Sequence, residues 1–332
     1  MRMASIPVQV IDAATTRALL PVAVCVDLMV DAMLAVTRRQ VALSTRSAHA
    51  LVDGSGHLGT MPGSCLEPRI FGCKVMSILP GNATQGRPTL NGVLLLFDAE
   101  TGLPRAVIDG ATLTAIRTAA TSALATRLLA RRDARTLLIM GNGVQAVEHI
   151  DAIRAVRDIG QVIVWSRSAE RGLGLCRIQS ERTGLPVVFE PNAERACAAA
   201  DIICCTTAAA TPVLRGRHVR PGTHVNLIGS HDAKSAEADA ELIASSVVFV
   251  DHMESALRDA GEIVQAIGTG AITASQLRGE IGQLVEGTIA GRSSDAETTV
   301  FKSIGLLAQD LVAGAHADRV MRRSCGGAPD GR

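Results

Sequence analysis

Short apolar runs alternate with amphipathic stretches of helix length through the middle of the chain. The apolar runs cover residues 137–140, 162–165, 186–189, 201–205, 224–228 and 247–250. Segments with helical periodicity follow the first three of them, over 144–156, 170–182 and 194–199. Runs of four to five apolar residues are typical of buried strands, and helices between them favour parallel pairing. The pattern therefore predicts an α/β fold with a Rossmann-type doubly wound parallel sheet.

The part of the chain before residue 122 has a different pattern. A helical stretch over 27–39 precedes strand-rich segments at 71–78 and 93–97, and a long helix is expected over 113–130. We therefore predict two domains, an α+β domain over 1–122 and a nucleotide-binding domain over 123–299. The glycine-rich end of the chain shows no periodicity, and we expect residues 323–332 to form a disordered tail.

Composition narrows the classes of function. Hydrophobic residues make up 47% of the chain and charged residues 20%, which is typical of a compact globular protein. A net charge of +1 and an aromatic content of 2% argue against a nucleic-acid partner. No long uncharged apolar run and no leader-like N-terminus is evident, so we expect a cytoplasmic protein that does not bind membranes. The eight cysteines lack metal-ligand spacing, and we predict no metal site.

A glycine motif follows the first strand of the predicted parallel sheet. Gly141, Gly143 and Ala146 form the pattern Gly-x-Gly-x-x-Ala between an apolar run and a helical segment. In this context the first glycine permits a tight turn, the second lets the backbone approach a pyrophosphate, and the small third residue lets helix and strand pack closely. The sequence therefore predicts a dinucleotide whose diphosphate lies at the helix N-terminus.

The end of the second strand bears on the choice of dinucleotide. NAD-specific sites place an acidic residue there to bind the ribose hydroxyls. Here the segment is Trp165-Ser166-Arg167-Ser168, which has a guanidinium and no carboxylate. We expect NADP to be preferred because Arg167 can bind its 2′-phosphate. Alternatively, Arg167 stacks on the adenine and NAD is also used.

Three cations in the first domain lie among small or apolar neighbours: Arg46, Lys74 and Arg117. A cation in such surroundings is costly unless it is paired with an anion. Each alone is readily explained by an internal salt bridge or by exposure to solvent. Together, without carboxylates nearby in the sequence, they suggest that the chain binds the carboxylate of a small substrate.

Motifs along almost the whole chain make a family resemblance specific. They lie at residues 72–75, 80–82, 92–98, 101–102, 113–123, 141–146, 221–226 and 299–305. In order and without a large gap, the chain resembles the ornithine cyclodeaminase/mu-crystallin family from about residue 6 to 320.

The resemblance implies a homodimer in which a C-terminal helix over 300–322 completes the substrate-binding and dimerisation domain of residues 1–122. It implies that Arg46, Lys74 and Arg117 hold a substrate carboxylate in a cleft beside the nucleotide domain, and that Ile304 and Gly305 line the substrate. The cofactor-contacting positions expected from the motifs and the resemblance are Thr89, Thr118, Gly141, Asn142, Gly143, Val144, Gln145, Ser166, Arg167, Ser168, Thr206, Thr207, Asn226, Ile228, Gly229 and Lys302.

Two departures from the cyclodeaminase pattern point to a reductase. After the last nucleotide-binding strand, cyclodeaminases carry an aspartate where this chain has His231, followed by Asp232. Residues 57–63 also lack the glutamate that cyclodeaminases place near Gly59. Both changes remove anions that would recognise a diamino acid but leave the three cations in place. They favour a ketimine reductase that acts on Δ1-pyrroline-2-carboxylate or Δ1-piperideine-2-carboxylate.

In that reaction we expect three residues to be catalytic. Lys74 would lower the cost of the charge change at the imine nitrogen, and His231 or Asp232 would keep the imine or the product amine in the right protonation state. Other functions remain open: a cyclodeaminase that recycles bound NAD on ornithine or lysine, an alanine-type amino-acid dehydrogenase acting on a 2-oxo acid, and a non-catalytic protein that holds NADPH and a small carboxylate ligand.

Overall fold

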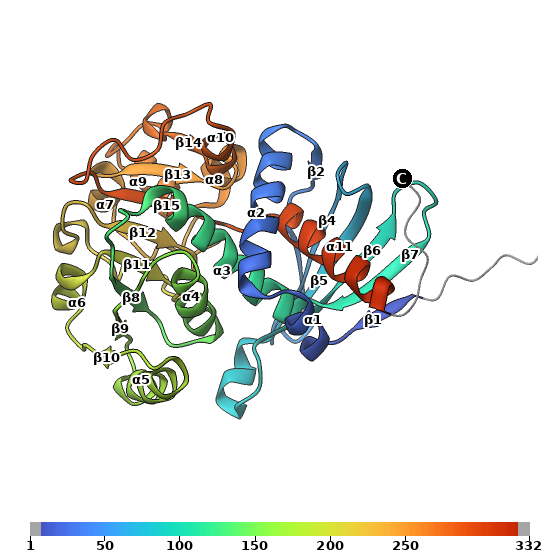
Figure 1. The fold of residues 1–332 in the computed structure, drawn as a ribbon, viewed down its shortest axis with the longest axis horizontal. Helices are drawn as coiled ribbons and strands as arrows, with labels where there is room; N and C mark the ends of the chain where they lie inside the picture. Colours follow the sequence, from blue (N-terminus) through green and yellow to red (C-terminus); the bar gives the residue numbers. More distant parts are fainter. Residues whose placement is uncertain (1–7, 325–332) are drawn as a thin grey trace, which may run out of the picture. The chain divides into compact units, whose positions relative to one another are not determined.

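The computed structural model describes residues 8–324, which divide into two compact units (Figure 1). The first unit contains the described residues up to Arg117 together with those from Leu306 onward, and the second contains Thr118–Gly305. The boundary between them falls within the long helix α3 (Gly110–Leu129). The first unit is therefore built from two separate parts of the chain.

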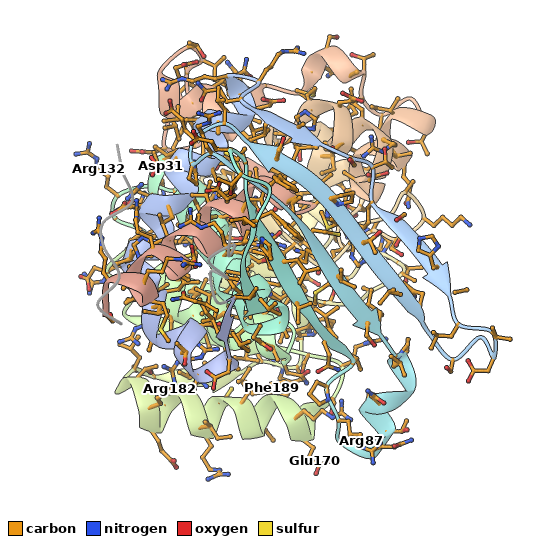
Figure 2. All side chains as sticks on the ribbon, turned by 90° about the vertical axis from the view of Figure 1, so that its right-hand side faces the viewer. Asp31, Arg87, Arg132, Glu170, Arg182 and Phe189 are labelled. Carbon is orange, nitrogen blue, oxygen red and sulfur yellow. The ribbon has the colours of Figure 1, made fainter. Side chains whose placement is uncertain are left out.

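A seven-stranded sheet forms the centre of the first unit. Its order is β1-β7-β6-β5-β4-β2, with β3 also paired to β4, and Figure 2 shows the long strands side by side. All of its pairs are antiparallel except that of β1 with β7. The predicted strand segments 71–78 and 93–97 are confirmed within β5 and β6. The strands are β1 (Gln9–Ile11), β2 (Val41–Leu43), β3 (Ser47–Ala50), β4 (His57–Cys65), β5 (Ile70–Ile78), β6 (Leu90–Asp98) and β7 (Pro104–Asp109).

One face of this sheet carries the helix α11 (Leu307–Ser324), which also packs against α2 (Val22–Thr37). Glycines allow the close approach of helix and sheet. A Cβ atom at Gly314 of α11 would lie 2.6 Å from Leu94 of β6, and one at Gly72 of β5 would lie 3.1 Å from Leu311. The N-terminal half of α11 is therefore held directly against the sheet. The short helices α1 (Ala13–Leu19) and η1 (Pro80–Gln85) complete the unit.

The opposite face of the sheet is apolar but only partly covered. Because the register aligns residues across neighbouring strands, one apolar row crosses five strands on this face. From β1 to β4 it consists of Val10, Val107, Leu95, Cys73 and Pro62. All five are at least partly exposed, and Val10 reaches 75%.

The second unit contains an eight-stranded sheet of order β10-β9-β8-β11-β12-β15-β13-β14. All its pairs are parallel, so the predicted doubly wound fold is confirmed. The strand order reverses between β8 and β11, and right-handed crossovers on the two sides of that point place helices on opposite faces. The strands are β8 (Thr136–Met140), β9 (Gln161–Trp165), β10 (Val187–Phe189), β11 (Ile202–Cys205), β12 (His224–Leu227), β13 (Val247–Val250), β14 (Gly279–Glu280) and β15 (Thr299–Lys302).

The helices of this unit connect the strands in chain order. The predicted helices over 144–156, 170–182 and 194–199 are confirmed to within two residues at each end. The helices are α4 (Val144–Arg154), α5 (Ala169–Thr183), α6 (Ala193–Ala199), α7 (Ala240–Ala244), α8 (Met253–Asp259), α9 (Gly261–Gly268) and α10 (Ile281–Glu286), with the short η2 (Gly216–His218) and η3 (Ala274–Gln276).

The expected C-terminal helix over 300–322 is wrong at its start. Residues 299–302 form β15, which lies between β12 and β13 and is fully buried. A β-branched and aromatic run, Thr299-Val300-Phe301, suits a central strand better than a helix. The helix starts only at Leu307, after a turn at Gly305, whose φ is 76°. It continues to Ser324, so the expected tail is wrong for residues 323 and 324, and residues 325–332 lie outside the described part.

No single helix between residues 8 and 324 is long and apolar enough to cross a membrane. The pair α1 and α2 passes a test of length and composition when taken together, but the two helices are bent by 79° at the break between them. Most of the apolar side chains of α2 are buried within the protein.

Candidate functional site

The glycine turn of the second unit lies where the strand order reverses. Gly141 follows β8 with a φ of 130°, a conformation that side chains rarely adopt. A Cβ atom there would lie 2.6 Å from Oγ1 of Thr206, the residue that follows β11. Gly141 is therefore required both by its backbone conformation and by the close approach of the neighbouring strand end. Ligands of doubly wound folds bind at this reversal point.

The helix α4 starts directly after this turn and has an open N-terminus. Its N-cap residue is Gly143, whose missing side chain leaves the first N–H groups without a side-chain acceptor. A Cβ atom at Gly143 would meet no heavy atom within 4 Å, and Val144 is 67% exposed. Gln145 has a buried Oε1 without a hydrogen-bond partner among the described residues. These features fit the diphosphate of a dinucleotide, which would be held by the N–H groups of residues in this turn.

The candidate residues for the adenosine end of a dinucleotide, Ser166, Arg167 and Ser168, lie in the turn after β9. Ser166 donates its hydroxyl to the carbonyl of Ser168 at 2.8 Å, and Ser168 caps α5 by accepting from the N–H of Arg171 at 3.3 Å. Both serine hydroxyls therefore shape the turn, and the Arg167 side chain between them is exposed. Without an acidic residue in this turn, a 2′-phosphate would meet no repulsion from it.

A buried carboxylate organises the predicted cofactor positions after β11 and β12. Glu237 accepts from the N–H groups of Thr207 at 2.7 Å, Ile228 at 3.1 Å and Gly229 at 2.6 Å. Burial raises the pKa of Glu237, while the positive charge of Lys302 acts in the opposite direction. The N–H groups at these positions are thus bonded within the protein, and their contribution to a cofactor site is to shape the backbone around it.

Lys302 and Asn226 lie deeper than the resemblance implies. Both side chains are 0% exposed. The ammonium of Lys302 lies 3.0 Å from the carboxylate of Glu262 and donates to the Ser230 carbonyl at 2.7 Å. Asn226 donates to the hydroxyl of Thr126 at 3.0 Å. Direct contact between Lys302 and a cofactor does not fit this geometry. Instead, Lys302 holds the loop that begins at Gly229.

That loop carries the two predicted proton-transfer residues. His231 is exposed, with Nδ1 3.3 Å from the carbonyl oxygen of Gly229. Asp232 accepts from the N–H groups of Lys234 at 2.9 Å and Ser235 at 3.0 Å. Burial alone would raise the pKa of Asp232, but these hydrogen bonds lower it overall. Asp232 therefore stabilises the turn as an ionised carboxylate, which leaves His231 as the better candidate for proton transfer.

The predicted substrate-lining residues Ile304 and Gly305 are fixed by a buried aspartate. Asp251, at the end of β13, accepts from the N–H groups of both residues at 2.9 Å and from the hydroxyl of Ser303 at 3.0 Å. Burial raises the pKa of Asp251, and these bonds act against that rise. The backbone of this turn is therefore rigid.

In the first unit, two of the three predicted cations share one carboxylate. Lys74 Nζ lies 2.8 Å from Oδ2 of Asp310, and Arg117 Nε lies 3.1 Å from its Oδ1. Lys74 and Arg117 are each 4% exposed and Asp310 is 0% exposed. The third cation, Arg46, is exposed in the loop between β2 and β3. We call Arg46, Lys74 and Arg117 the cation cluster.

Burial lowers the pKa of Lys74 to about 8. The negative charge of Asp310 raises this pKa, whereas the positive charges of Arg117 and Arg46 lower it. The internal salt bridge considered for each cation alone is thus real for Lys74 and Arg117. One buried carboxylate thus holds both buried cations, and the charge of Arg46 also acts on Lys74.

The remaining predicted cofactor positions lie in both units. Thr89 belongs to the first unit and is exposed, and its backbone carbonyl accepts a hydrogen bond from the N–H of Leu79 at 2.9 Å. Thr118 is 7% exposed and is the first residue of the second unit. Asn142 is half-buried in the glycine turn.

Sequence reasoning missed four buried carboxylates that hold candidate site residues, one in the first unit and three in the second: Asp310, Glu237, Glu262 and Asp251. Asp310 is separated from Lys74 by 236 positions and from Arg117 by 193. A search for acidic residues near each cation in the sequence could not find it. One available signal was the position of Asp310 in the first turn of an amphipathic helix, where an apolar residue would be expected against a sheet.

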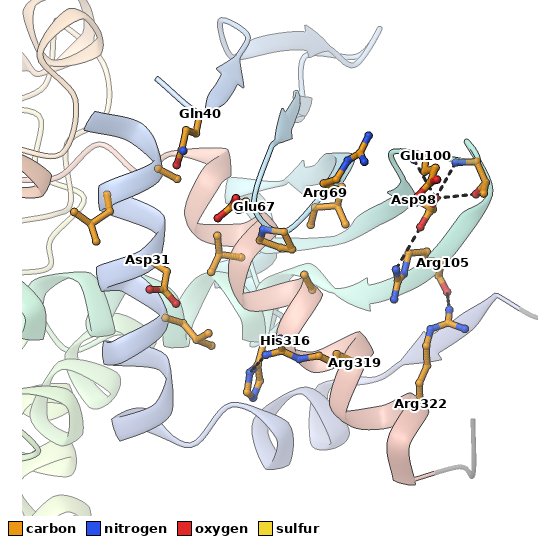
Figure 3. A pocket seen from close by; sticks show the side chains of 18 of the residues that line it. Asp31, Gln40, Glu67, Arg69, Asp98, Glu100, Arg105, His316, Arg319 and Arg322 are labelled. Atoms are coloured by element: carbon orange, nitrogen blue, oxygen red, sulfur yellow. Dashed lines mark hydrogen bonds and ion pairs between the residues drawn. The ribbon is translucent and has the colours of Figure 1, made fainter. Parts of the chain in front are cut away.

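A separate cavity of about 940 Å³ lies at the edge of the first unit, lined by residues of α2, α11 and the turns after β4 and β6 (Figure 3). Arg105 pairs there with Asp98 at 3.5 Å and with Asp318 at 2.8 Å, and Arg322 donates to the carbonyl of Arg105 at 2.9 Å. None of the predicted site residues lines this cavity. It is distinct from the cation cluster.

Between residues 8 and 324, no group of three or more His, Cys, Asp or Glu side chains is placed to hold a metal ion. The cysteines of this part of the chain are free thiols. Burial raises the pKa of Cys197 and Cys204 to about 12, so these thiols stay protonated and unreactive.

Comparison with known proteins gives consistent matches. The model of the ornithine cyclodeaminase/mu-crystallin family matches residues 10–321. A Δ1-pyrroline-2-carboxylate reductase from Bacillus cereus (strain ATCC 10987) is 38% identical over 268 residues, which is 80% of this chain and 82% of the relative.

Two solved structures are similar over nearly the whole chain. One is the Thermococcus litoralis Δ1-pyrroline-2-carboxylate reductase in complex with NADH and L-proline, with a TM-score of 0.91, 28% identity, and coverage of 97% of this chain and 100% of that one. The other is an archaeal alanine dehydrogenase dimer with bound NAD. Its TM-score is 0.89 and its identity 27%, and the match covers 97% of this chain and 98% of that one. The protein belongs to the ornithine cyclodeaminase/mu-crystallin family.

Proposed function

We propose that this protein is an NAD(P)H-dependent reductase that converts Δ1-pyrroline-2-carboxylate to proline. The similar Bacillus cereus and Thermococcus litoralis proteins carry that activity in their names, and the latter was solved with NADH and L-proline. The observation that carries the proposal is the cation cluster, in which Lys74 and Arg117 are buried on the same carboxylate and the charge of Arg46 acts on Lys74. A cyclic imine has a single carboxylate for these cations to bind, and it has no second amine that would need an anionic side chain on the protein.

The two buried residues of the cation cluster each have a definite task in this reaction. Arg117 supplies a delocalised positive charge for the substrate carboxylate, and Lys74 adds a compact charge beside it. Together they fix the ring of the substrate, so that its C=N carbon is held in one orientation. A reduced nicotinamide, when bound, supplies the hydride for that carbon.

The nitrogen of the imine must be protonated for reduction, and the product is a secondary amine. His231 is the residue we assign to this proton, because an imidazole can both donate and accept a proton and its ring is tethered to Gly229. Lys74, whose pKa is about 8, is charged at neutral pH and balances the change in charge at the ring nitrogen.

For the cofactor, we propose a preference for NADPH over NADH. Support comes from the exposed Arg167 in a turn without a carboxylate. The similar solved structures contain NADH or NAD, so a site that accepts both cofactors is the competing possibility.

We further propose a homodimer that buries the partly exposed apolar row of the first sheet. The row crosses five strands in register and ends at Val10, an exposed valine. Two copies of such an apolar face can cover one another about a twofold axis, which is the commonest symmetry of homo-oligomers. The similar alanine dehydrogenase is described as a dimer.

The test is a substrate panel with both reduced cofactors, followed by nicotinamide absorbance, proline and ammonia assays. With Δ1-pyrroline-2-carboxylate we expect one cofactor oxidised for each proline formed, and higher kcat/KM with NADPH. Replacing Arg117 by Gln should lower kcat/KM by about a hundredfold, since a charged contact with the substrate carboxylate is lost. The same change at exposed Arg127, on the same helix, is the matched control.

The other outcomes each favour a different function. Ammonia release from ornithine or lysine without net cofactor change would indicate a cyclodeaminase. Oxidation of cofactor with pyruvate and ammonium, but not with the cyclic imine, would indicate an amino-acid dehydrogenase. Binding of NADPH without any turnover would indicate a binding protein. Equal or higher kcat/KM with NADH would contradict the NADPH preference.

A further inference from the structure

The first turn of α11 provides the groups that bind the buried members of the cation cluster. Asp310 bridges them, with Oδ2 2.8 Å from Lys74 and Oδ1 3.1 Å from Arg117. Lys74 comes from β5 and Arg117 from α3, so a single carboxylate ties together three elements. A buried carboxylate in this position fixes both cations relative to each other.

The preceding residue, Gln309, fixes a second edge of Arg117. Its Oε1 accepts from Nη1 of Arg117 at 2.5 Å and from the N–H of Leu306 at 3.4 Å. The side chain is 0% exposed. Because Nε and Nη1 of Arg117 are both bonded to α11, the plane of the guanidinium cannot rotate.

The charges that face Lys74 come from each of the packed elements. Asp310 lies on α11, Arg117 on α3, and Arg46 in the loop before β3. Cys25 on α2 lies near Arg117 and Asp310, but burial raises its pKa to about 12, so it stays a neutral thiol. Burial and the two arginines all lower the pKa of Lys74, and Asp310 is the group that opposes them.

We propose that Asp310, assisted by Gln309, is a positioning residue for substrate: it orients Arg117 and keeps Lys74 protonated, so that both can bind the substrate carboxylate. This inference rests on the proposed function and adds a residue to it. Asp310 itself carries the same charge as the substrate carboxylate and acts through the two cations.

The experiment compares Asp310→Asn, Asp310→Glu, Lys74→Arg and the double variant Lys74→Arg/Asp310→Asn with the unchanged protein. KM and kcat for Δ1-pyrroline-2-carboxylate are measured from about pH 6 to about pH 9.5. The values for each variant are divided by those for the unchanged protein at the same pH, so that the effect of substrate ionisation cancels. The KM for NADPH and the Tm serve as controls. Calorimetric binding of L-proline gives a readout that needs no turnover.

In the unchanged protein, KM for the imine should rise above about pH 8 as Lys74 loses its proton. Asp310→Asn lowers the pKa of Lys74, so the rise should start at lower pH, with KM at pH 8 larger by about tenfold and KM for NADPH unchanged. Lys74→Arg/Asp310→Asn should lack this rise because arginine keeps its charge, so its KM divided by that of the unchanged protein should fall above about pH 8. Asp310→Glu should raise KM while the rise stays near pH 8.

A purely structural role would give a different result. Asp310→Asn would then lower Tm and kcat but leave the pH at which KM rises unchanged, which would overturn the proposal. If Asp310→Asn does not fold, the proposal is overturned when Asp310→Glu leaves KM for the imine and L-proline binding unaltered. Failure of the proposed function is seen separately, as absence of imine reduction by the unchanged protein; calorimetry with L-proline and pyruvate then still tests whether Asp310 supports carboxylate binding.

Discussion

At the scale of single residues, burial of titratable groups explains much of the chemistry of this protein. His149 on α4 is an example, since it is fully buried and both of its ring nitrogens have partners. Its Nδ1 lies 2.7 Å from the Gln145 carbonyl oxygen and its Nε2 lies 2.9 Å from the hydroxyl of Ser122. Burial lowers its pKa to about 4, although the contact with the Gln145 carbonyl acts in the opposite direction. The folded protein therefore keeps His149 neutral where an unfolded chain would protonate it.

This makes stability sensitive to acid with a definite sign. Below the ordinary histidine pKa of 6.5, His149 becomes protonated in the unfolded state, but in the folded state it stays neutral down to about pH 4. The free energy of unfolding therefore falls as the pH drops from 6.5 to about 4. The free energy of unfolding should fall between pH 7 and pH 5, and replacing His149 by Gln should make this fall smaller by about 2 kcal/mol. Urea unfolding at the two pH values measures it. The same change at exposed His49 is the control, and an unaltered difference in His149→Gln would refute the prediction.

The residue scale also limits what could be read from the sequence. Arg46, Lys74 and Arg117 were identified because cations are unusual among apolar neighbours, which is a local signal. The pairing of Lys74 with Asp310 could not be predicted in the same way, since it depends on a contact across 236 positions. The buried location of Lys302 was equally invisible, because a lysine in a strand looks the same in sequence whether its ammonium reaches solvent or Glu262.

At the scale of elements, the sequence predicted the parallel sheet well and the mixed sheet poorly. Strands of the second unit are buried on both faces and read as unbroken apolar runs, such as Ile202–Cys205. In the first unit, β4 contains Gly59, Pro62 and Gly63, which obscure a strand pattern. The strand β15 was mistaken for helix because it is joined by only four residues to a real one.

The glycine turn offers a matched pair of substitutions at this scale. Gly143→Ala places a methyl group in open space, so we expect an unchanged Tm but a Kd for NADPH weaker by at least about tenfold, or 1.4 kcal/mol, because the diphosphate is displaced. Gly141→Ala meets Thr206 at 2.6 Å with φ at 130°, so it should also destabilise the fold by about 1–3 kcal/mol. Thermal unfolding and NADPH titration separate the two effects. Unimpaired NADPH binding by Gly143→Ala would contradict the diphosphate assignment.

At the scale of the whole molecule, the partly exposed apolar row predicts self-association. Leu95 lies at its centre, between Val107 and Cys73. Leu95→Glu places a charge in the proposed interface, so we expect this variant to be a monomer of 34.6 kDa, whereas the unchanged protein should be a dimer of twice that mass. Light scattering after size-exclusion chromatography measures this. Leu173→Glu, at a residue of α5 that is 57% exposed, should remain dimeric. A Leu95→Glu protein that remains dimeric would place the interface elsewhere.

The discontinuity of the first unit has a consequence for biosynthesis. Strands β1 to β7 leave the ribosome early, but the helix that covers them and supplies Asp310 is translated after the entire nucleotide-binding unit. Until then, Lys74 and Arg117 lack their counter-charge and the sheet lacks its apolar cover, a state prone to aggregation. A nascent chain stalled before Leu307 would therefore hold a sheet it cannot bury, and chaperones would be expected to engage that sheet throughout the time in which the nucleotide-binding unit is made.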